Sequence, residues 1–326
     1  MQRCDGTLYQ SPEWLAASAR GNSEPRYFMW GDADGEPIAI AAGTLRRSGV
    51  PLLGRWNGSL TLDSLPAAVP ERRGYGTAML EALKRHAFAA GCRTLAIESH
   101  MAQPLSMDAR VLAATVRDRI EFRLDLAPPE ERLWEGLHSH HRRKIKKAMK
   151  QDLAIRESAE IADARALRDL QRGSQDRRRK RGENMVLGDD EPIVALMANM
   201  LTAGLGRLFL AEHADRIVSG AFMSTFNARA YYVFGGSHSD GFRLDAPGLL
   251  FWHMIRTFKS DRYVELNLGG VPASGADSAA AEHGLYRFKA GFGGREVPCA
   301  DYSFDLRPRL TSAMQLATRV LRSVKG

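Results

Sequence analysis

The chain has 326 residues, a length typical of two domains rather than one. With 44% hydrophobic and 26% charged residues, its composition is that of a globular protein and excludes a disordered or fibrous chain. The 46 Lys and Arg residues outnumber the 38 Asp and Glu residues, and the net charge of +8 favours an anionic partner, whether nucleic acid, a phosphorylated substrate or an anionic membrane face.

The three cysteines, Cys4, Cys92 and Cys299, lie far apart and fit no metal or redox spacing, which indicates a reducing compartment. The first ten residues hold no apolar signal core, and no apolar run approaches the roughly 20 residues that span a bilayer. We therefore expect a cytoplasmic protein, with the inner face of the membrane as an alternative location.

The first third of the chain predicts mixed α/β structure. Strands are expected at 26–31 and 36–43 around the turn "DADG", and another within "RWNGSLTLDS" at 55–64. A loop at 70–76 then leads into an apolar-periodic helix, which Gly91 ends, and a strand follows at 94–98.

The remainder has a similar order. A strand at 120–126 precedes a set of helices that includes 190–203. Strands are then expected at 206–213, 217–226 and 228–237, followed by a helix at 245–263 and a strand at 264–270.

Both parts therefore run antiparallel strands, a turn, a helix and a strand, which suggests two copies of one fold. We expect an α/β (α+β) protein with domains at 1–117 and 118–326, each a mixed, largely antiparallel sheet flanked by helices. The segment 308–326 is amphipathic and predicts a helix packed on its own domain or, alternatively, one lying on a membrane surface.

The segment "PERRGYGTAMLEAL" places glycines just before a helix, where backbone amides can face phosphates. Its spacing resembles the pyrophosphate loop of GNAT acyltransferases, which bind acetyl-CoA there. The residues that carry this resemblance, and that we expect to bind a CoA cofactor, are Arg73, Gly74, Gly76 and Ala78.

The segment "HSHHRRKIKKAMKQDLAI" holds six cations in nine residues. On a helix, Arg143 and Lys147 share one face with Lys146 and Lys150, and such a face suits several phosphates. A second basic run, "RRRKR", stands at 177–181. The neighbouring histidines lack carboxylate or cysteine partners at ligand spacing, so we expect no metal site.

Glycine pairs end two predicted strands. Gly235, Gly236 and Ser237 precede a helix, and Gly269 and Gly270 follow Asn267, positions at which α/β sheets often bind ligands. Simple turn geometry is the alternative reading of each pair.

The order of these pieces, with "YYVFGGS", "LNLGG" and "LYRFKAGFGG", resembles the Fem-type (FemABX) aminoacyltransferases and related GNAT-like acyltransferases. Fem enzymes have two GNAT-like domains. The chain differs from the family in carrying Asn267 where an Asp is frequent, and its length leaves no room for the helical arm of some members.

The resemblance implies a transferase that moves an amino acid from aminoacyl-tRNA, its co-substrate, to an amine of a cell-wall precursor. That precursor would be a UDP- or lipid-linked muramyl-peptide. The resemblance implies no metal or prosthetic group and leaves peripheral membrane contact open. Its residues for substrate binding would be Arg143, Lys147, Tyr232, Gly235, Gly236, Ser237, Asn267, Gly269, Gly270, Phe288, Phe292 and Gly293.

Acyl transfer places negative charge on a carbonyl oxygen, which a fixed cation stabilises. Lys289, expected in a Gly-rich loop that Phe288 and Phe292 pack, is our catalytic candidate. A surface lysine or a phosphate ligand are the alternatives. His253, Glu265, Asp301 and Asp305 remain open as a base.

Two other functions stay open at this point. One is an acyl-CoA-dependent N-acyltransferase acting on a polysaccharide, lipid or small-molecule amine, which "RGYGTA" and Asn267 favour. The other is a non-enzymatic protein that binds RNA or a membrane surface, which the charge alone favours. The oligomeric state is not predicted.

Overall fold

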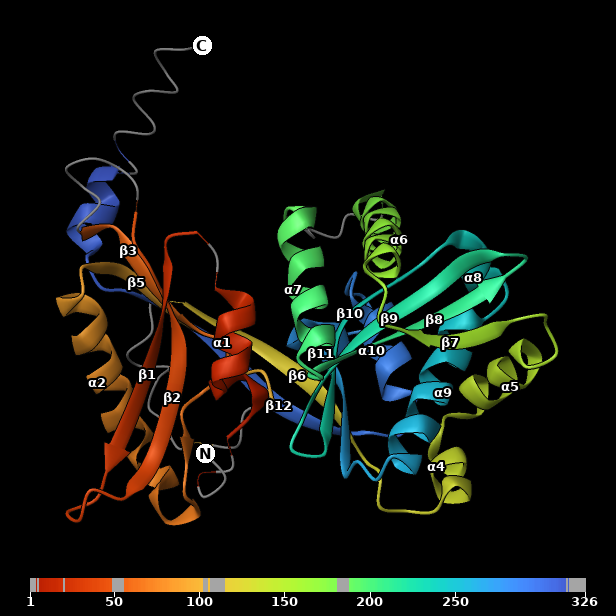
Figure 1. Ribbon diagram of the computed structural model, residues 1–326, viewed down its shortest axis with the longest axis horizontal. Coiled ribbons are helices and arrows are strands. Elements are labelled where there is room, and N and C mark those ends of the chain that lie inside the picture. Colours follow the sequence, from red (N-terminus) through yellow and green to blue (C-terminus); the bar gives the residue numbers. More distant parts are fainter. Residues whose placement is uncertain are drawn as a thin grey trace, which may run out of the picture. The chain divides into compact units, whose positions relative to one another are not determined.

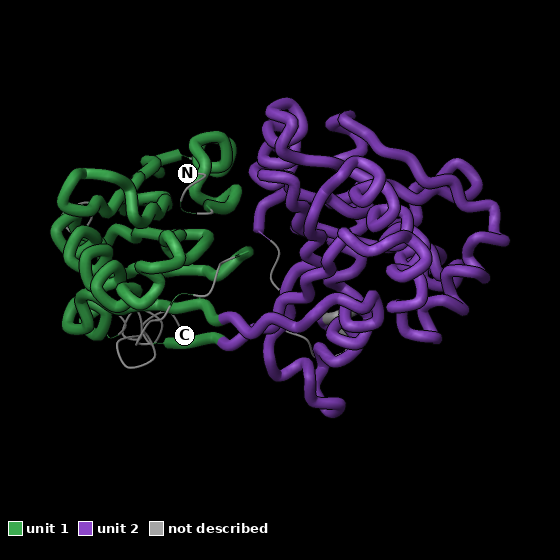
Figure 2. Tube along the Cα trace, turned by 90° about the horizontal axis from the view of Figure 1, so that it is seen from below, with its two compact units in different colours: residues 1–117, 300–326 green, residues 118–299 purple. Residues whose placement is uncertain are grey.

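The computed structural model describes residues 4, 6–19, 21–48, 56–101, 105, 115–180, 188–314 and 316. The chain forms two compact units, residues 1–117 with 300–326 and residues 118–299 (Figure 2). Two strands, β6 (Thr115–Asp125) and β12 (Arg295–Asp305), pass from one unit to the other. The first unit therefore takes strands from both ends of the sequence.

The first unit is a sheet with one long helix. Its strand order is β1, β2, β3, β5 and β12, and β4 pairs with β2. Strands β3 and β5 pair in parallel, and helix α2 connects them, as a parallel crossover requires. The elements are η2 (Leu8–Gln10), α1 (Pro12–Ser18), β1 (Ser23–Gly31), β2 (Pro37–Arg46), β3 (Gly58–Leu62), β4 (Ala67–Ala68), η4 (Pro70–Tyr75), α2 (Gly76–Ala89) and β5 (Cys92–Ile97).

Helix α2 forms because its apolar residues recur every three to four positions and face the sheet. Leu80 and Leu83 are buried against Leu60 of β3 and Leu95 of β5, and Phe304 of β12 joins the same core. Since β12 pairs with β5 from Tyr302 to Asp305, this core depends on a strand that lies about 200 residues further along the chain than β5.

The second unit has the larger sheet. Its strand order is β12, β6, β11, β10, β9, β8 and β7, and β10 and β11 form the parallel pair (Figure 1). Its other elements are α4 (Glu130–Gly136), α5 (Ser139–Ala148), β7 (Ala154–Ser158), α6 (Ile161–Lys180), α7 (Asp190–Thr202), β8 (Gly206–His213), β9 (Arg216–Phe226), β10 (Arg229–Ser237), α8 (Ser239–Arg243), α9 (Ala246–Ser260), β11 (Glu265–Pro272), η5 (Ala273–Ala276) and α10 (His283–Ala290).

Alternate residues of β8 and β9 face opposite layers of helices, as the two-residue period of a strand dictates. Phe209 and Met223 pack in the core that contains Phe258 of α9. On the other face, Gly220 approaches Leu167 of α6 and Gly206 approaches Met200 of α7. The sheet is therefore covered on both faces, by α9 on one and by α6 and α7 on the other (Figure 1).

The expected fold class is confirmed, because both units contain a mixed sheet flanked by helices. Strand β7 and the short helix α8 had no sequence prediction. The expectation of a loop around residue 289 is wrong, since α10 runs through it to Ala290. The predicted helix at 308–326 lies mostly outside the described residues, which show helix at 308–314.

Gly236 allows strand β10 to pack closely against helix α6. A Cβ on Gly236 would lie 2.6 Å from the backbone nitrogen of Gln171 and from the carbonyl carbon of Leu170. We expect Gly236→Ala to lower the free energy of unfolding by about 1–3 kcal/mol, because a helix backbone must move to admit the methyl group. Urea unfolding measures this change.

Gly173→Ala, also in α6, is the matched control. The nearest atom to its new Cβ would be an arginine nitrogen at 3.6 Å, an ordinary contact. This variant should keep or raise the stability by up to about 1 kcal/mol, since alanine favours a helix interior over glycine. Equal stability of the two variants would contradict the close packing of β10 on α6.

Candidate functional site

The parallel strands β10 and β11 separate after three paired positions, which end at Tyr231 and Asn267. Each strand then has an irregularity: β10 between Tyr232 and Phe234, and β11 between Asn267 and Gly270. β10 continues to Ser237 and β11 to Pro272. Because the strands diverge at their carboxyl ends, backbone and side chains there can reach a ligand, which is the usual position for a site in an α/β sheet.

Lys289 lies at this divergence. Its Nζ donates a hydrogen bond to the carbonyl oxygen of Gly270 at 3.0 Å and lies 5.2 Å from the ring centroid of Tyr232. Only 4% of the residue's surface is exposed. The lysine is therefore a buried cation held by a backbone carbonyl and an aromatic face, and the surface-lysine alternative is wrong.

The glycines around Lys289 mark the end of α10 rather than a loop. Gly291 follows the last helical residue, and Gly293 has φ +80°, a conformation that glycine adopts without steric cost. A Cβ on Gly293 would lie 2.6 Å from the carbonyl oxygen of Gly136, and one on Gly291 would overlap the ring of His141. These glycines allow α10 to pack against α4 and α5.

A continuous group of aromatic rings extends from Tyr232, the ring over which Nζ of Lys289 lies. Tyr232 lies 5.1 Å from Phe251, and Phe251 lies 5.1 Å from both Phe288 and Phe292, measured between ring centroids. His141 continues the group, 4.7 Å from Phe292. Phe288 and Phe292 therefore pack on each other, and the group reaches Lys289 through Tyr232.

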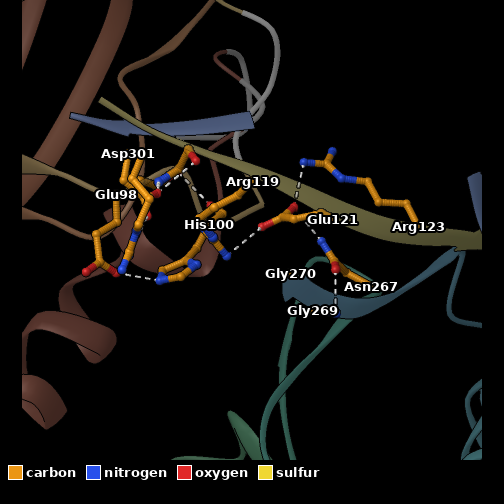
Figure 3. A network of polar contacts seen from close by, with 12 residues as sticks. Glu98, His100, Arg119, Glu121, Arg123, Asn267, Gly269, Gly270 and Asp301 are labelled. Atoms are coloured by element: carbon orange, nitrogen blue, oxygen red, sulfur yellow. Dashed lines mark hydrogen bonds and ion pairs between the residues drawn. The ribbon is translucent and has the colours of Figure 1, made fainter. Parts of the chain in front are cut away.

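A buried polar network holds β11 on its other side (Figure 3). Asn267 donates from Nδ2 to Oε2 of Glu121 at 2.8 Å, and its Oδ1 accepts a hydrogen bond from the amide of Gly269 at 2.8 Å. Arg123 donates to the same oxygen of Glu121 at 3.1 Å. Glu121 and Asn267 are fully buried. The network fixes the irregular part of β11 next to the carbonyl that Lys289 contacts.

Arg119 and Tyr231 extend this network. An Nη of Arg119 lies 4.0 Å from Oε1 of Glu121 and occupies the space beside Gly270 that a Cβ would take. Burial raises the pKa of Tyr231, and the charge of Glu121 raises it further, so the phenol stays protonated. None of Arg119, Glu121, Arg123 and Tyr231 was a candidate from the sequence. The first three alternate with apolar residues along one strand, a pattern that predicts a strand with one polar face and does not show that this face is buried.

The basic helix α5 is partly neutralised. Lys144 and Lys147 form ion pairs with the two carboxylate oxygens of Asp245, at 3.1 and 3.3 Å, and Arg143 contacts Nδ1 of His140 at 3.0 Å. Lys144, Lys147 and Arg143 are nevertheless exposed to solvent. The predicted phosphate-binding pair, Arg143 and Lys147, therefore lies at the surface beside α9 rather than next to Lys289.

The three residues at the end of β10 pack inside the unit. A Cβ on Gly235 would overlap the hydroxyl of Tyr232, and Gly236 contacts α6. The hydroxyl of Ser237 lies 2.8 Å from that of Ser219. These contacts give Gly235, Gly236 and Ser237 a packing role, in agreement with the alternative that their glycines serve backbone geometry.

In the first unit, the predicted cofactor loop forms η4 and the start of α2. Arg73 and Gly74 lie in the 3-10 helix, and Gly76 begins α2 with Ala78 in its first turn. A Cβ on Gly74 would meet no atom within 4 Å. The strand–loop–helix context that the sequence predicted is therefore present.

Asp301, one of the four candidates for a general base, forms hydrogen bonds within the first unit. Its carboxylate accepts hydrogen bonds from the hydroxyl and amide of Ser99, both at 3.2 Å, and from Arg117 at 2.6 Å. Burial lowers the pKa of His253, which keeps that imidazole neutral at pH 7. Among the described residues, no three His, Cys, Asp or Glu side chains are placed to hold a metal ion.

A cavity of about 450 Å³ lies in the second unit, between α5, the start of α9 and α10. His140, His141 and Lys144 line it from α5, and Tyr286 and Phe288 line it from α10. Nε2 of His141 lies 2.9 Å from the carbonyl oxygen of Phe288, so Nε2 carries the proton. Burial lowers the pKa of His141, which keeps the ring neutral at pH 7.

Residues 138–290 match the family model of a GNAT acetyltransferase domain. That segment is therefore a GNAT-type acyltransferase domain, and the protein is an acyltransferase. A search of curated proteins found no significant match. Within the described part of the chain, no helix has the length and apolar character needed to cross a bilayer.

Solved structures with the same fold include FemX, with a TM-score of 0.71 at 14% identity over 94% of each chain. A tandem GNAT protein from the clavulanic acid biosynthesis pathway has a TM-score of 0.53 at 13% identity, covering 91% of this chain and 88% of its own. The C-terminal domain of a putative lysylphosphatidylglycerol synthetase from Agrobacterium fabrum has a TM-score of 0.52 at 17% identity, covering 94% and 90%. The GNAT acyltransferase thus has the Fem-type, tandem GNAT fold that its sequence resembles.

The network around Glu121 predicts that Asn267→Asp destabilises this acyltransferase. A carboxylate cannot donate to Glu121, and two adjacent carboxylates raise the pKa of at least one of them in the folded state. Folded protein then binds more protons than unfolded protein above about pH 4, so the free energy of unfolding falls as pH rises. We expect a loss of about 2–4 kcal/mol at pH 8 and a smaller loss at pH 5.

Asn267→Ala serves as the control, because it removes the same hydrogen bonds without adding a charge. Its loss of stability should be similar at pH 5 and pH 8 in urea unfolding. A stability of Asn267→Asp equal to that of the wild type at both pH values would refute the buried donation from Asn267 to Glu121.

Proposed function

We propose that the protein transfers an aminoacyl group from aminoacyl-tRNA to an amine of a peptidoglycan precursor. The observation that carries this proposal is the likeness to FemX, which extends over 94% of both chains with a TM-score of 0.71, against 0.52 and 0.53 for the other two folds described. The sequence resemblance to Fem-type enzymes points to the same donor and acceptor.

In the proposed reaction, the acceptor amine attacks the ester carbonyl of the aminoacyl-tRNA. A carbon–nitrogen bond forms and the bond from the carbonyl carbon to the ribose oxygen breaks, while the amine loses a proton and the ribose oxygen gains one. Negative charge develops on the carbonyl oxygen between these steps. Lys289 is the catalytic residue that stabilises this charge, because its ammonium lies in a buried, pre-organised position.

The surroundings of Lys289 support this role. Nζ donates to the carbonyl of Gly270 and lies over the ring of Tyr232, and both a carbonyl oxygen and an aromatic face attract a cation. A cation in an apolar setting interacts with a developing oxyanion more strongly than one in water. Asn267 and Gly269 position the irregular strand next to it, and the acyl group would enter where β10 and β11 diverge.

The acceptor would be a UDP- or lipid-linked muramyl-peptide, whose diphosphate suits the exposed cations of α5. Arg143 and Lys147 are the residues that we propose for phosphate contact. The proposed site of the protein is the inner face of the membrane or the cytoplasm, where both the tRNA and the precursor are present.

An acyl-CoA-dependent N-acyltransferase is the second candidate function. It is favoured by the match of residues 138–290 to an acetyltransferase family model. In that case the loop of Arg73, Gly74, Gly76 and Ala78, which leads into α2, would hold the pyrophosphate of CoA.

The role of Lys289 predicts that Lys289→Met lowers kcat by about 100- to 1000-fold, because the variant lacks one transition-state cation. Its KM values should change little, and its melting temperature should stay equal or rise, since a buried charge is replaced by an apolar side chain of similar length. Steady-state transfer assays and thermal unfolding measure these quantities.

Lys259→Met is the matched control. Lys259 also donates from Nζ to a backbone carbonyl at 3.0 Å, that of Leu126, but lies at the far end of α9. This variant should keep the wild-type kcat. Wild-type turnover in Lys289→Met would exclude Lys289 as the catalytic cation.

The donor is tested by transfer to a UDP-muramyl-pentapeptide, with a radiolabelled acyl group on either tRNA or CoA. We expect a labelled peptide product from aminoacyl-tRNA and none from acetyl-CoA. Product from acetyl-CoA alone would replace the proposed function by its alternative, and Arg73→Ala should then abolish CoA binding.

A further inference from the structure

A groove of about 450 Å³ lies in the first unit, where the end of α2 meets the helical segment at 308–314. Trp56 lines it from the stretch before β3, Phe88 from the last turn of α2, and Leu310 from the helical segment. Trp56 is 41% exposed and Phe88 is 50% exposed. Large apolar side chains gathered at one exposed place mark a surface that another molecule covers.

Two arginines hold the walls of this groove. Arg93 donates from Nε to Oδ1 of Asn57 at 2.8 Å and from Nη1 to Oγ1 of Thr311 at 3.3 Å, so it joins the stretch before β3 to the helical segment. Arg307 donates from Nη2 to the carbonyl oxygen of Phe88 at 2.7 Å, and its guanidinium carbon lies 4.0 Å from the centroid of the Phe88 ring. The exposed ring is therefore held in place, and the surface is pre-formed.

The groove carries positive charge. The hydrogen bonds of Arg93 and Arg307 end on neutral oxygens, so these bonds leave both guanidinium charges uncompensated. Arg309 is an exposed lining residue, and the described lining contains no acid. Asp305, which precedes the lining in the sequence, accepts a hydrogen bond from the amide of Arg307 at 3.0 Å. The surface therefore suits a partner with an anionic face and an apolar interior.

The sequence continues the same pattern past the groove. Leu316 is 64% exposed. From Leu306 to Gly326 the chain has five Lys and Arg residues and no Asp or Glu. Exposed Trp, Phe and Leu side chains with basic neighbours are typical of proteins that lie on a bilayer, because aromatic rings settle among the headgroups and cations are attracted to anionic lipids.

We infer that this surface docks on an anionic lipid bilayer, with Trp56 and Phe88 in the headgroup region and Arg309 at the lipid phosphates. A second copy of the chain fits the surface less well, because a two-fold interface would place the same arginines against each other. The inference is independent of the acyl donor and acceptor, and its residues lie outside the segment 138–290 that matches the GNAT domain.

The test is sedimentation of the full chain with vesicles of phosphatidylglycerol and phosphatidylcholine, compared with vesicles of phosphatidylcholine alone. We expect binding to the anionic vesicles that falls as salt is raised, and far weaker binding to the neutral ones. Phe88→Ala should weaken binding by about 5-fold, since the exposed half of its ring is what the bilayer would bury. Arg309→Glu should weaken it by about 10- to 30-fold, because it removes one cation from the anionic surface and adds an anion.

Two controls match these variants. Tyr75→Ala removes a ring of similar exposure, 53%, which also has an arginine over it, Arg72, but lies at the other end of α2. Arg132→Glu makes the same change of net charge at an exposed arginine of α4, in the second unit. Both controls should bind the anionic vesicles as the wild type does.

Trp56→Ala is a second variant of the docking surface, which keeps the test independent of the contact between Phe88 and Arg307. It should also weaken vesicle binding, with a melting temperature equal to that of the wild type. Absence of sedimentation with anionic vesicles, or equal weakening by Phe88→Ala and Tyr75→Ala, would overturn the inference. So would a dimer that Phe88→Ala dissociates and that does not bind vesicles, since the surface would then be an interface between copies of the chain.

Discussion

The buried carboxylate of Glu121 is the constraint on which the second unit depends. A charge removed from water must be compensated, and here Arg123 and the amide of Asn267 donate to a single oxygen while Arg119 faces the other. The remaining acceptor of Asn267 binds the amide of Gly269, so the same side chain that satisfies Glu121 also shapes β11. The irregular strand, the carbonyl of Gly270 and the position of Lys289 all follow from that arrangement.

This network also accounts for a difference from the family pattern. An Asp at position 267 could accept from Gly269 but could not donate to Glu121, and it would add a second negative charge to a buried site. In this chain, the partner strand carries a glutamate opposite the irregularity, so an amide is the residue that meets both requirements. Asn267 therefore follows from the presence of Glu121 and is no evidence for acyl-CoA rather than aminoacyl-tRNA as the acyl donor.

Local patterns predicted much of the fold and part of the site. The helical period of α2 and α9, and the glycine pairs at strand ends, were sufficient to identify the two similar units and to single out Tyr232, Asn267, Gly270 and Lys289, which the structure brings together. Local patterns failed where a tertiary contact decides the outcome. Glycines after "YRFKA" were read as a loop because nothing local shows that His141 and Gly136 require them. Glu121 and its arginines were not singled out, because the burial of both faces of β6 comes from its neighbours in the sheet.

The path of β12 has a consequence for how the chain is made. The sheet of the first unit takes its last strand from β12, whose residues 302–305 pair with β5 more than 200 residues earlier in the sequence. The ribosome must therefore synthesise the chain as far as Asp305 before the first unit can complete its hydrophobic core, whereas most of the second unit is already available to fold by then. The first unit is thus the first to begin synthesis and the last to complete its fold.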